Sequence, residues 1–87
     1  MTYTVLLHPK AAKALNKTEE KTRITEKLKQ LKTSPEKAGK RLKYCEYYSL
    51  RIGDYRAIYE INTNQKQVIV LYIGHRKNVY NDFTKIF

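Results

Sequence analysis

The sequence predicts an α+β fold: a compact antiparallel sheet of about four strands, with an N-terminal helical hairpin on one face and a short C-terminal helix or tail. Three observations lead to this prediction. Two helix-like segments lie in the N-terminal part, two β-patterned runs are joined by Gly53 and Asp54, and an apolar run follows at residues 68–73. The chain has 87 residues, so we expect one domain over residues 1–87.

The N-terminal part begins with a short strand and a helix. Residues 3–7 are rich in β-forming side chains and predict the first strand, which His8 and Pro9 end. Proline suits the first turn of a helix, where its missing N–H costs nothing, so a short helix is expected over residues 10–15.

A second helix is expected to follow Thr18, whose hydroxyl can cap it. Glu19 and Glu20 would then lie in its first turn, where carboxylates match the helix dipole. Residues 33–35, Thr-Ser-Pro, are expected to end it. Its apolar stripe recurs at i, i+4 and i+7 and consists of Ile24, Leu28 and Leu31.

The C-terminal half predicts the sheet. Residues 47–52 and 55–61 are β-patterned runs, and the two-residue Gly-Asp loop between them indicates a tight hairpin. Residues 68–73 are apolar throughout, which fits a strand covered on both faces. The tail over residues 77–87 is expected to form a short helix or to lie ordered on the sheet.

The hairpin fixes a register that places Arg51 directly opposite Arg56, on the face away from the helices. Like charges in this position destabilise a hairpin. The guanidinium fork binds phosphate bidentately, so the pair predicts an anion site. The alternative is that both side chains extend into water or are neutralised by Glu46, Glu60 or Asp54.

The last strand is expected to bring a third arginine to the same end of the sheet. A turn pairing Ile61 with Val68 places His75 near Asp54, so that His75 and Arg76 would converge with Arg56. Tyr80 follows Arg76 by four residues, and a helical turn would put it on the same side. His75 is therefore a candidate for proton transfer, or else a structural residue.

The net charge of +10 points to a polyanionic partner, either nucleic acid, an anionic membrane or an acidic protein. A membrane role is not expected, because no long helix has a wide apolar face. Residues 36–43 are expected to be a loop that contacts RNA or is a solvated linker. The expected RNA-contacting cations are Lys37, Lys40, Arg41, Lys43 and Lys77.

The sequence indicates no cofactor and no metal site. Cys45 is a single cysteine, so it cannot form an internal disulfide, and it has no histidine at metal-ligand spacing. The N-terminal apolar run is too short for a signal peptide or a membrane span. The cytoplasm is the expected location.

Two segments, residues 50–59 (LRIGDYRAIY) and residues 68–80 (VIVLYIGHRKNVY), resemble the RelE branch of the RelE/ParE toxin superfamily. The resemblance extends over essentially the whole chain. It implies a metal-free endoribonuclease that cleaves mRNA in the ribosomal A site and is silenced in a complex with a RelB-like antitoxin. It also implies roles for Arg56 and Arg76 in phosphate charge stabilisation, and for Tyr80 in positioning the nucleotide.

Two positions depart from the family pattern. Arg51 and Ser49 stand where the well-studied members carry lysines, one of which is a candidate base. Arginine hardly deprotonates, so the base of this chain is left open between His75 and Tyr80. The alternatives are a ParE-like gyrase inhibitor and a non-catalytic RNA-binding module of the same fold.

An antitoxin surface is expected on the sheet face away from the helices. That face would carry an exposed apolar patch, covered only by the short tail, and such a patch usually marks an interface. Its predicted members are Ile58, Ile69, Leu71 and Ile73.

Overall fold

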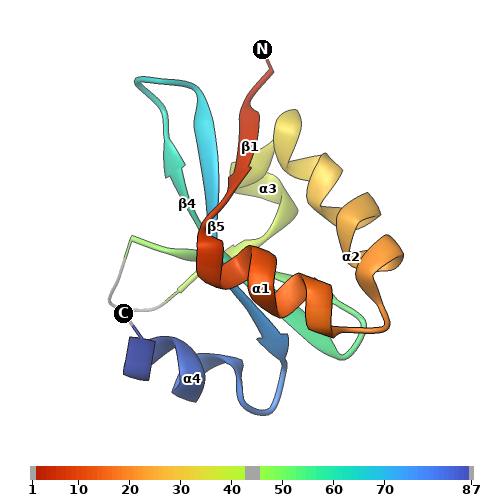
Figure 1. The fold of residues 1–87 in the computed structure, drawn as a ribbon. Helices are drawn as coiled ribbons and strands as arrows, with labels where there is room; N and C mark the ends of the chain where they lie inside the picture. Colours follow the sequence, from red (N-terminus) through yellow and green to blue (C-terminus); the bar gives the residue numbers. More distant parts are fainter. Residues whose placement is uncertain (1, 43–45, 87) are drawn as a thin grey trace.

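In the computed structural model, which describes residues 2–42 and 46–86, five strands form one sheet in the order β1-β5-β4-β3-β2 (Figure 1). The α+β prediction is confirmed. The sheet is mixed, because β1 pairs parallel to β5 while the other pairs are antiparallel. The strands are β1 (Thr4–Leu7), β2 (Lys40–Arg41), β3 (Tyr48–Ile52), β4 (Tyr55–Asn62) and β5 (Gln67–His75).

The predicted helical hairpin is present, and α1 crosses in front of the sheet (Figure 1). The helical elements before the hairpin strands are α1 (Pro9–Lys17), α2 (Lys21–Leu28), the 3-10 turn η1 (Lys29–Lys32) and α3 (Pro35–Ala38).

Two local expectations in this region were wrong. The helix after Thr18 begins only at Lys21, because the Thr18 hydroxyl accepts the N–H of Glu20 at 3.2 Å and closes a turn. Glu19 and Glu20 therefore precede α2. Residues 36–43 are not simply a loop: Pro35 opens α3, as a proline at a first helical position can, and β2 follows.

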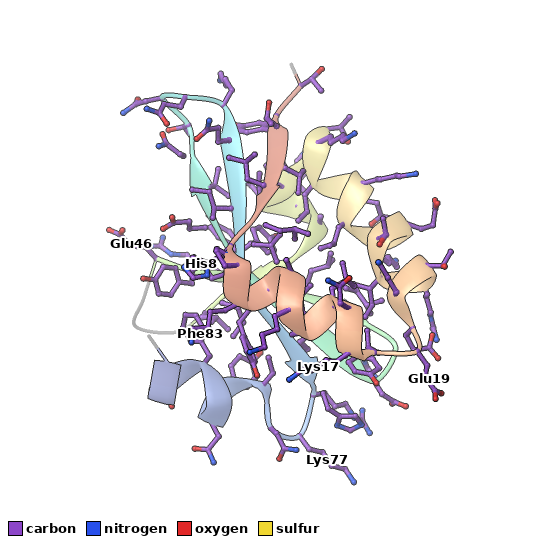
Figure 2. All side chains as sticks on the ribbon, in the orientation of Figure 1. His8, Lys17, Glu19, Glu46, Lys77 and Phe83 are labelled. Atoms are coloured by element: carbon purple, nitrogen blue, oxygen red, sulfur yellow. The ribbon has the colours of Figure 1, made fainter. Side chains whose placement is uncertain are left out.

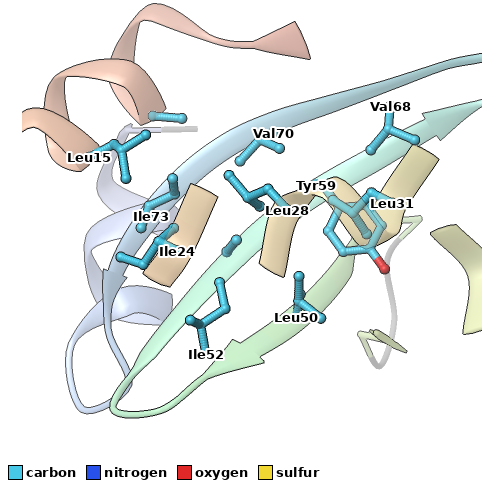
Figure 3. Packing of buried hydrophobic residues seen from close by; sticks show 12 residues of the cluster. Leu15, Ile24, Leu28, Leu31, Leu50, Ile52, Tyr59, Val68, Val70 and Ile73 are labelled. Carbon is cyan, nitrogen blue, oxygen red and sulfur yellow. The ribbon is translucent and has the colours of Figure 1, made fainter. Parts of the chain in front are cut away.

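The main core lies between the helices and the sheet (Figure 3). One side of α1 contributes Ala11 and Leu15, and α2 contributes Ile24 and Leu28. The strand residues follow the predicted alternation, since every second side chain of β3 and β4 faces the helices. These are Tyr48, Leu50, Ile52, Tyr55, Ala57, Tyr59 and Ile61.

The opposite sheet face is not an open apolar patch, which corrects the prediction. The C-terminal helix α4 (Val79–Ile86) covers it, and Val79 and Phe83 pack with Ile58 and Leu71 in a second buried cluster. Ile58 is fully buried. Figure 2 shows Phe83 between α4 and the sheet.

A β-bulge explains why one patch member was assigned to the wrong face. Tyr59 pairs with Val70, but Ile58 pairs with Tyr72, so Leu71 is an extra residue in β5. Leu71 and Tyr72 both belong to the α4 cluster, and Ile73 returns to the helix face (Figure 3).

A hydrogen bond on the helix face of the sheet holds the chain in place just before it enters β2. The buried Tyr59 hydroxyl donates to the Pro35 carbonyl at 2.6 Å. A Cβ at Gly39 would lie 2.5 Å from the same hydroxyl, so only glycine allows this approach. Burial raises the pKa of Tyr59 to about 12, aided by Tyr48, while a hydrogen bond from the Gly39 backbone partly lowers it.

We predict that Tyr59→Phe lowers the free energy of unfolding by about 1–2 kcal/mol, because the buried Pro35 carbonyl loses its donor. Urea denaturation at pH 7 measures this. Tyr48→Phe is the control, since it removes a hydroxyl from the ring stacked on Tyr59 and leaves the bond to Pro35 in place. Equal losses in both variants would contradict the assignment.

The same residue predicts an alkaline limit of stability. The pKa of Tyr59 is raised to about 12 in the folded protein, whereas an unfolded tyrosine titrates near its ordinary pKa of 10.0. Its contribution is fully present below pH 10 and is lost as the pH rises toward 12, because only the unfolded state ionises in that window. Unfolding free energies at pH 9 to 11.5 should fall more steeply for the wild type than for Tyr59→Phe.

Candidate functional site

The β3–β4 hairpin builds the centre of the candidate site. Gly53 adopts a left-handed conformation with φ of 60° in the two-residue turn. The observed register pairs Ile52 with Tyr55 and Arg51 with Arg56, which confirms the predicted cross-strand pair. The Arg51 Nε also donates to the Gly53 carbonyl at 3.4 Å, which draws this side chain along the hairpin toward the turn.

Arg56, Tyr80 and Ser49 form a hydrogen-bonded row on the α4 face of the sheet. The Arg56 Nη1 donates to the Tyr80 hydroxyl at 3.4 Å, and that hydroxyl donates to the Ser49 Oγ at 3.1 Å. The Arg56 guanidinium carbon also lies 5.9 Å from the centroid of the Tyr80 ring. Ser49 is 4% exposed, while Tyr80 is 38% exposed. The row therefore has a buried anchor and an accessible aromatic ring.

The serine that stands in place of a lysine at position 49 is in direct contact with Tyr80. Sequence alternation already put Ser49 on the face of Arg51 and Arg56, but gave it no role. The structure shows that it accepts the Tyr80 hydroxyl. The sequence marked Ser49 as a departure from the family pattern, but its contact with Tyr80 could not be predicted, because it depends on where α4 packs on the sheet.

Arg76 lies at the hairpin end of the sheet, as expected. Its backbone N–H donates to the Asp54 carbonyl at 2.7 Å, and its Nε lies 4.0 Å from the Asp54 Oδ1. These contacts place Arg76 beside the turn of the hairpin, at the rim of the site.

His75 does not converge with Arg56, which corrects the prediction. The bulge shifts the register by one residue, so His75 pairs with Tyr55 instead of Asp54. The His75 ring packs edge-on against the Tyr55 ring, with centroids 5.7 Å apart, on the side of the sheet that carries α1. The imidazole and the arginine pair are on opposite faces.

The predicted RNA-contacting cations lie on three different segments. Lys37 is exposed on α3, and Lys77 is exposed in the turn before α4. Lys40 lies on the edge strand β2, directly opposite Ser49, and Arg41 lies opposite Tyr48. Lys40 thus borders the Ser49–Tyr80 row, whereas Arg41 shares the helix face with Tyr48. Lys43 lies outside the described residues.

No carboxylate neutralises the arginine pair in the part of the chain that the structure describes. The ion pairs there join Arg23 to Glu20, Lys29 to Glu26 and Arg76 to Asp54. The predicted alternative, neutralisation by Glu46, Glu60 or Asp54, is therefore not what the geometry shows. Neither guanidinium group is paired with a described carboxylate, so both remain available to an anion.

The described residues also bear on metal and membrane binding. They contain no group of three or more His, Cys, Asp or Glu side chains that could hold a metal ion. Within the same residues, no helix is long and apolar enough to cross a membrane.

A model of the ParE toxin of type II toxin–antitoxin systems matches residues 5–80 of this chain. The chain belongs to the RelE/ParE superfamily of type II toxins. No curated protein matches this toxin in sequence.

Solved structures similar to this toxin are mostly RelE toxins. A chain of the Mycobacterium tuberculosis RelBE2 toxin–antitoxin complex is 28% identical with a TM-score of 0.80, over 87% of this chain and 93% of that one. A chain of the archaeal RelE–RelB complex from Pyrococcus horikoshii is 29% identical with a TM-score of 0.73, over 87% and 97%. A chain of a Pseudomonas aeruginosa ParDE system shares the fold, at 16% identity and a TM-score of 0.72, over 85% and 96%.

We predict that Arg51→Gln stabilises the toxin by about 0.5 kcal/mol at low salt, because it removes a like charge directly opposite Arg56. Urea denaturation in 20 mM and 500 mM NaCl measures the gain, which should shrink at high salt as the charges are screened. Lys27→Gln, on the exposed surface of α2, is the control of equal charge. A destabilised Arg51→Gln variant would show that the pair is not repulsive.

Proposed function

We propose that this toxin is a ribosome-dependent mRNA endoribonuclease of the RelE type that inhibits translation in the cytoplasm. One observation carries the proposal: two arginines stand side by side without a described carboxylate, next to an accessible tyrosine ring tied to Arg56. Guanidinium groups bind a phosphate through paired hydrogen bonds, and an aromatic ring stacks on a base of single-stranded RNA. This combination suits one nucleotide and its 3′-phosphate.

The proposed reaction is an in-line attack within the RNA. The 2′-oxygen forms a bond to its own 3′-phosphorus while the bond to the 5′-oxygen breaks, giving a cyclic phosphate and a 5′-hydroxyl end. One proton leaves the 2′-hydroxyl and one reaches the departing 5′-oxygen. Arg51 and Arg56 would stabilise the charge that develops on the phosphate, with Arg76 at the rim on the leaving-group side.

The proton acceptor we propose is Tyr80 in its phenolate form, which takes up the 2′-hydroxyl proton and becomes the neutral phenol. His75, the other candidate base, lies on the other face of the sheet, against Tyr55. Among the described residues, Tyr80 is the titratable side chain that contacts Arg56 directly. Its hydroxyl is held at a fixed position between Arg56 and Ser49.

The proposed partner is a cognate RelB-like antitoxin that holds the toxin in an inactive heterocomplex. The similar M. tuberculosis and P. horikoshii chains come from complexes with such antitoxins, which supports the proposal. The exposed apolar side chains Leu6 and Leu7 on the edge strand β1 offer contact area for it.

We predict that Arg56→Ala abolishes ribosome-dependent mRNA cleavage, by a factor of at least about 100, while the protein stays folded. Sequencing of 5′-hydroxyl ends on ribosome-bound mRNA measures cleavage, and circular dichroism checks the fold. Lys27→Ala, on α2, should cleave like the wild type. Full cleavage by folded Arg56→Ala would refute the assignment of the site. A wild-type protein that binds RNA without cutting it would identify a non-catalytic RNA-binding module instead.

Tyr80→Phe separates proton transfer from stacking. The variant keeps the aromatic ring but loses the hydroxyl that Arg56 and Ser49 hold, so kcat should fall about 100-fold or more with little change in KM. The kcat of Ser49→Ala should fall less, because this variant removes only the hydroxyl that accepts the hydrogen bond from Tyr80. Single-turnover cleavage at several toxin concentrations across pH 6–9 measures these effects in both variants. Near wild-type kcat in Tyr80→Phe would leave the ring only a stacking role.

Gyrase inhibition is the second candidate function, because the family model that matches residues 5–80 is that of ParE toxins. A supercoiling assay with purified gyrase and relaxed plasmid tests it, in parallel with the ribosome assay. Inhibition of supercoiling without any new 5′-hydroxyl ends would replace the nuclease proposal.

A further inference from the structure

The face of the toxin that carries α1 has a pocket outside the arginine site. It has a volume of about 450 Å³ and lies between α1, the end of β5 and the turn before α4. A second pocket of about 420 Å³ adjoins it and shares Lys17, Thr18, Tyr55 and His75 with it. The rest of its lining is Glu19, Glu20 and Asp54, so the second pocket does not suit a phosphate. Pockets of this size accommodate a ligand as large as a nucleotide.

Three lysines line the helical wall of this pocket. Lys10, Lys13 and Lys17 follow at i, i+3 and i+7, so they share one side of α1, while Ala11 and Leu15 are buried on the other. In the described part of the chain, no carboxylate lies within 4.0 Å of these three ammonium groups. Figure 2 shows Lys17 at the end of α1 nearest the turn that carries Lys77.

Two aromatic rings line the strand side of the same pocket. The rings of Tyr55 and His75 meet edge-on, with centroids 5.7 Å apart, and both are only partly buried. An aromatic ring next to unpaired ammonium groups is a combination that binds single-stranded nucleic acid. The ammonium groups contact the phosphates, and a base stacks on the ring.

We propose that this pocket, the α1 pocket, is a second RNA-binding site that holds one unpaired nucleotide. The lysines of α1 contact its phosphates, and its base stacks on the Tyr55–His75 pair. The sheet separates the α1 pocket from the Arg51–Arg56 pair, so one toxin molecule can bind RNA at two sites. The inference concerns binding and holds whether or not the arginine site cleaves RNA.

The test uses the Arg56→Ala toxin, which prevents cleavage, and a hexa-adenylate RNA as the probe. Replacing Lys10, Lys13 and Lys17 together by Gln should weaken binding about ten-fold or more at low salt. The slope of log K against log salt should fall by about 1.4, because contacts to the two phosphates that flank one nucleotide are lost at about 0.7 each. The control triple variant, Lys21, Lys27 and Lys32 to Gln, removes equal charge from exposed positions of α2 and η1.

Two further measurements test whether a base stacks on the Tyr55–His75 pair. His75→Ala should bind hexa-adenylate about five-fold more weakly than His75→Phe, and an abasic hexamer should not distinguish the two variants. In NMR titrations, the amide signals of Lys13, Tyr55 and His75 should shift when the RNA is added.

Three outcomes would overturn the proposal: equal affinity and salt slope in the two triple variants, shifts confined to the residues around Arg51 and Tyr80, or an abasic hexamer bound as tightly as hexa-adenylate. A polyglutamate peptide that displaces the RNA at equal concentration would instead identify the α1 pocket as a site for an acidic protein. Assays of mRNA cleavage, which need a toxin that keeps Arg56, test only the arginine site and not the α1 pocket.

Discussion

The packing of α4 against the sheet is the contact on which the arginine site depends. Val79 and Phe83 are buried with Ile58 and Leu71, and Tyr80 lies between them on the chain. Burial of two such side chains contributes roughly 3–6 kcal/mol relative to exposure. That exceeds the cost of the Arg51–Arg56 pair, at most about 1 kcal/mol. The docked helix can therefore hold the Tyr80 hydroxyl beside Arg56 despite the repulsion across the hairpin.

The bulge in β5 makes that docking possible. Without the bulge, strict alternation along β5 would turn Tyr72 toward α1 and Ile73 toward α4. The bulge gives α4 two neighbouring apolar partners, Leu71 and Tyr72, and returns Ile73 to the main core. The same shift places Gly74 opposite Arg56 and under Val79, where a Cβ would approach the Val79 side chain to 3.3 Å. A larger residue there would press on the first turn of α4, which carries Tyr80.

Much of the fold could be predicted from the sequence because its signals are local. The Gly-Asp turn set the register of Arg51 and Arg56, and alternation set which face met the helices. What failed depends on tertiary packing. The bulge falls inside an unbroken apolar run with no glycine to mark it, so His75 was assigned to the wrong face. The two-residue strand β2 exists through its pairing with β3, and no periodicity can reveal it.

The misassignment of His75 changes how the charge of the molecule is understood. The sequence suggested one cationic patch at one end of the sheet, whereas the structure divides its members between two faces. Arg56 and Tyr80 belong to the α4 face, and His75 joins the lysines of α1 on the other. The two groups still share a strand end, because Tyr55 and Arg56 are adjacent and alternate in direction. A single register in β4 and β5 thus positions both sets of side chains, so any change that moves the bulge should disturb both faces together.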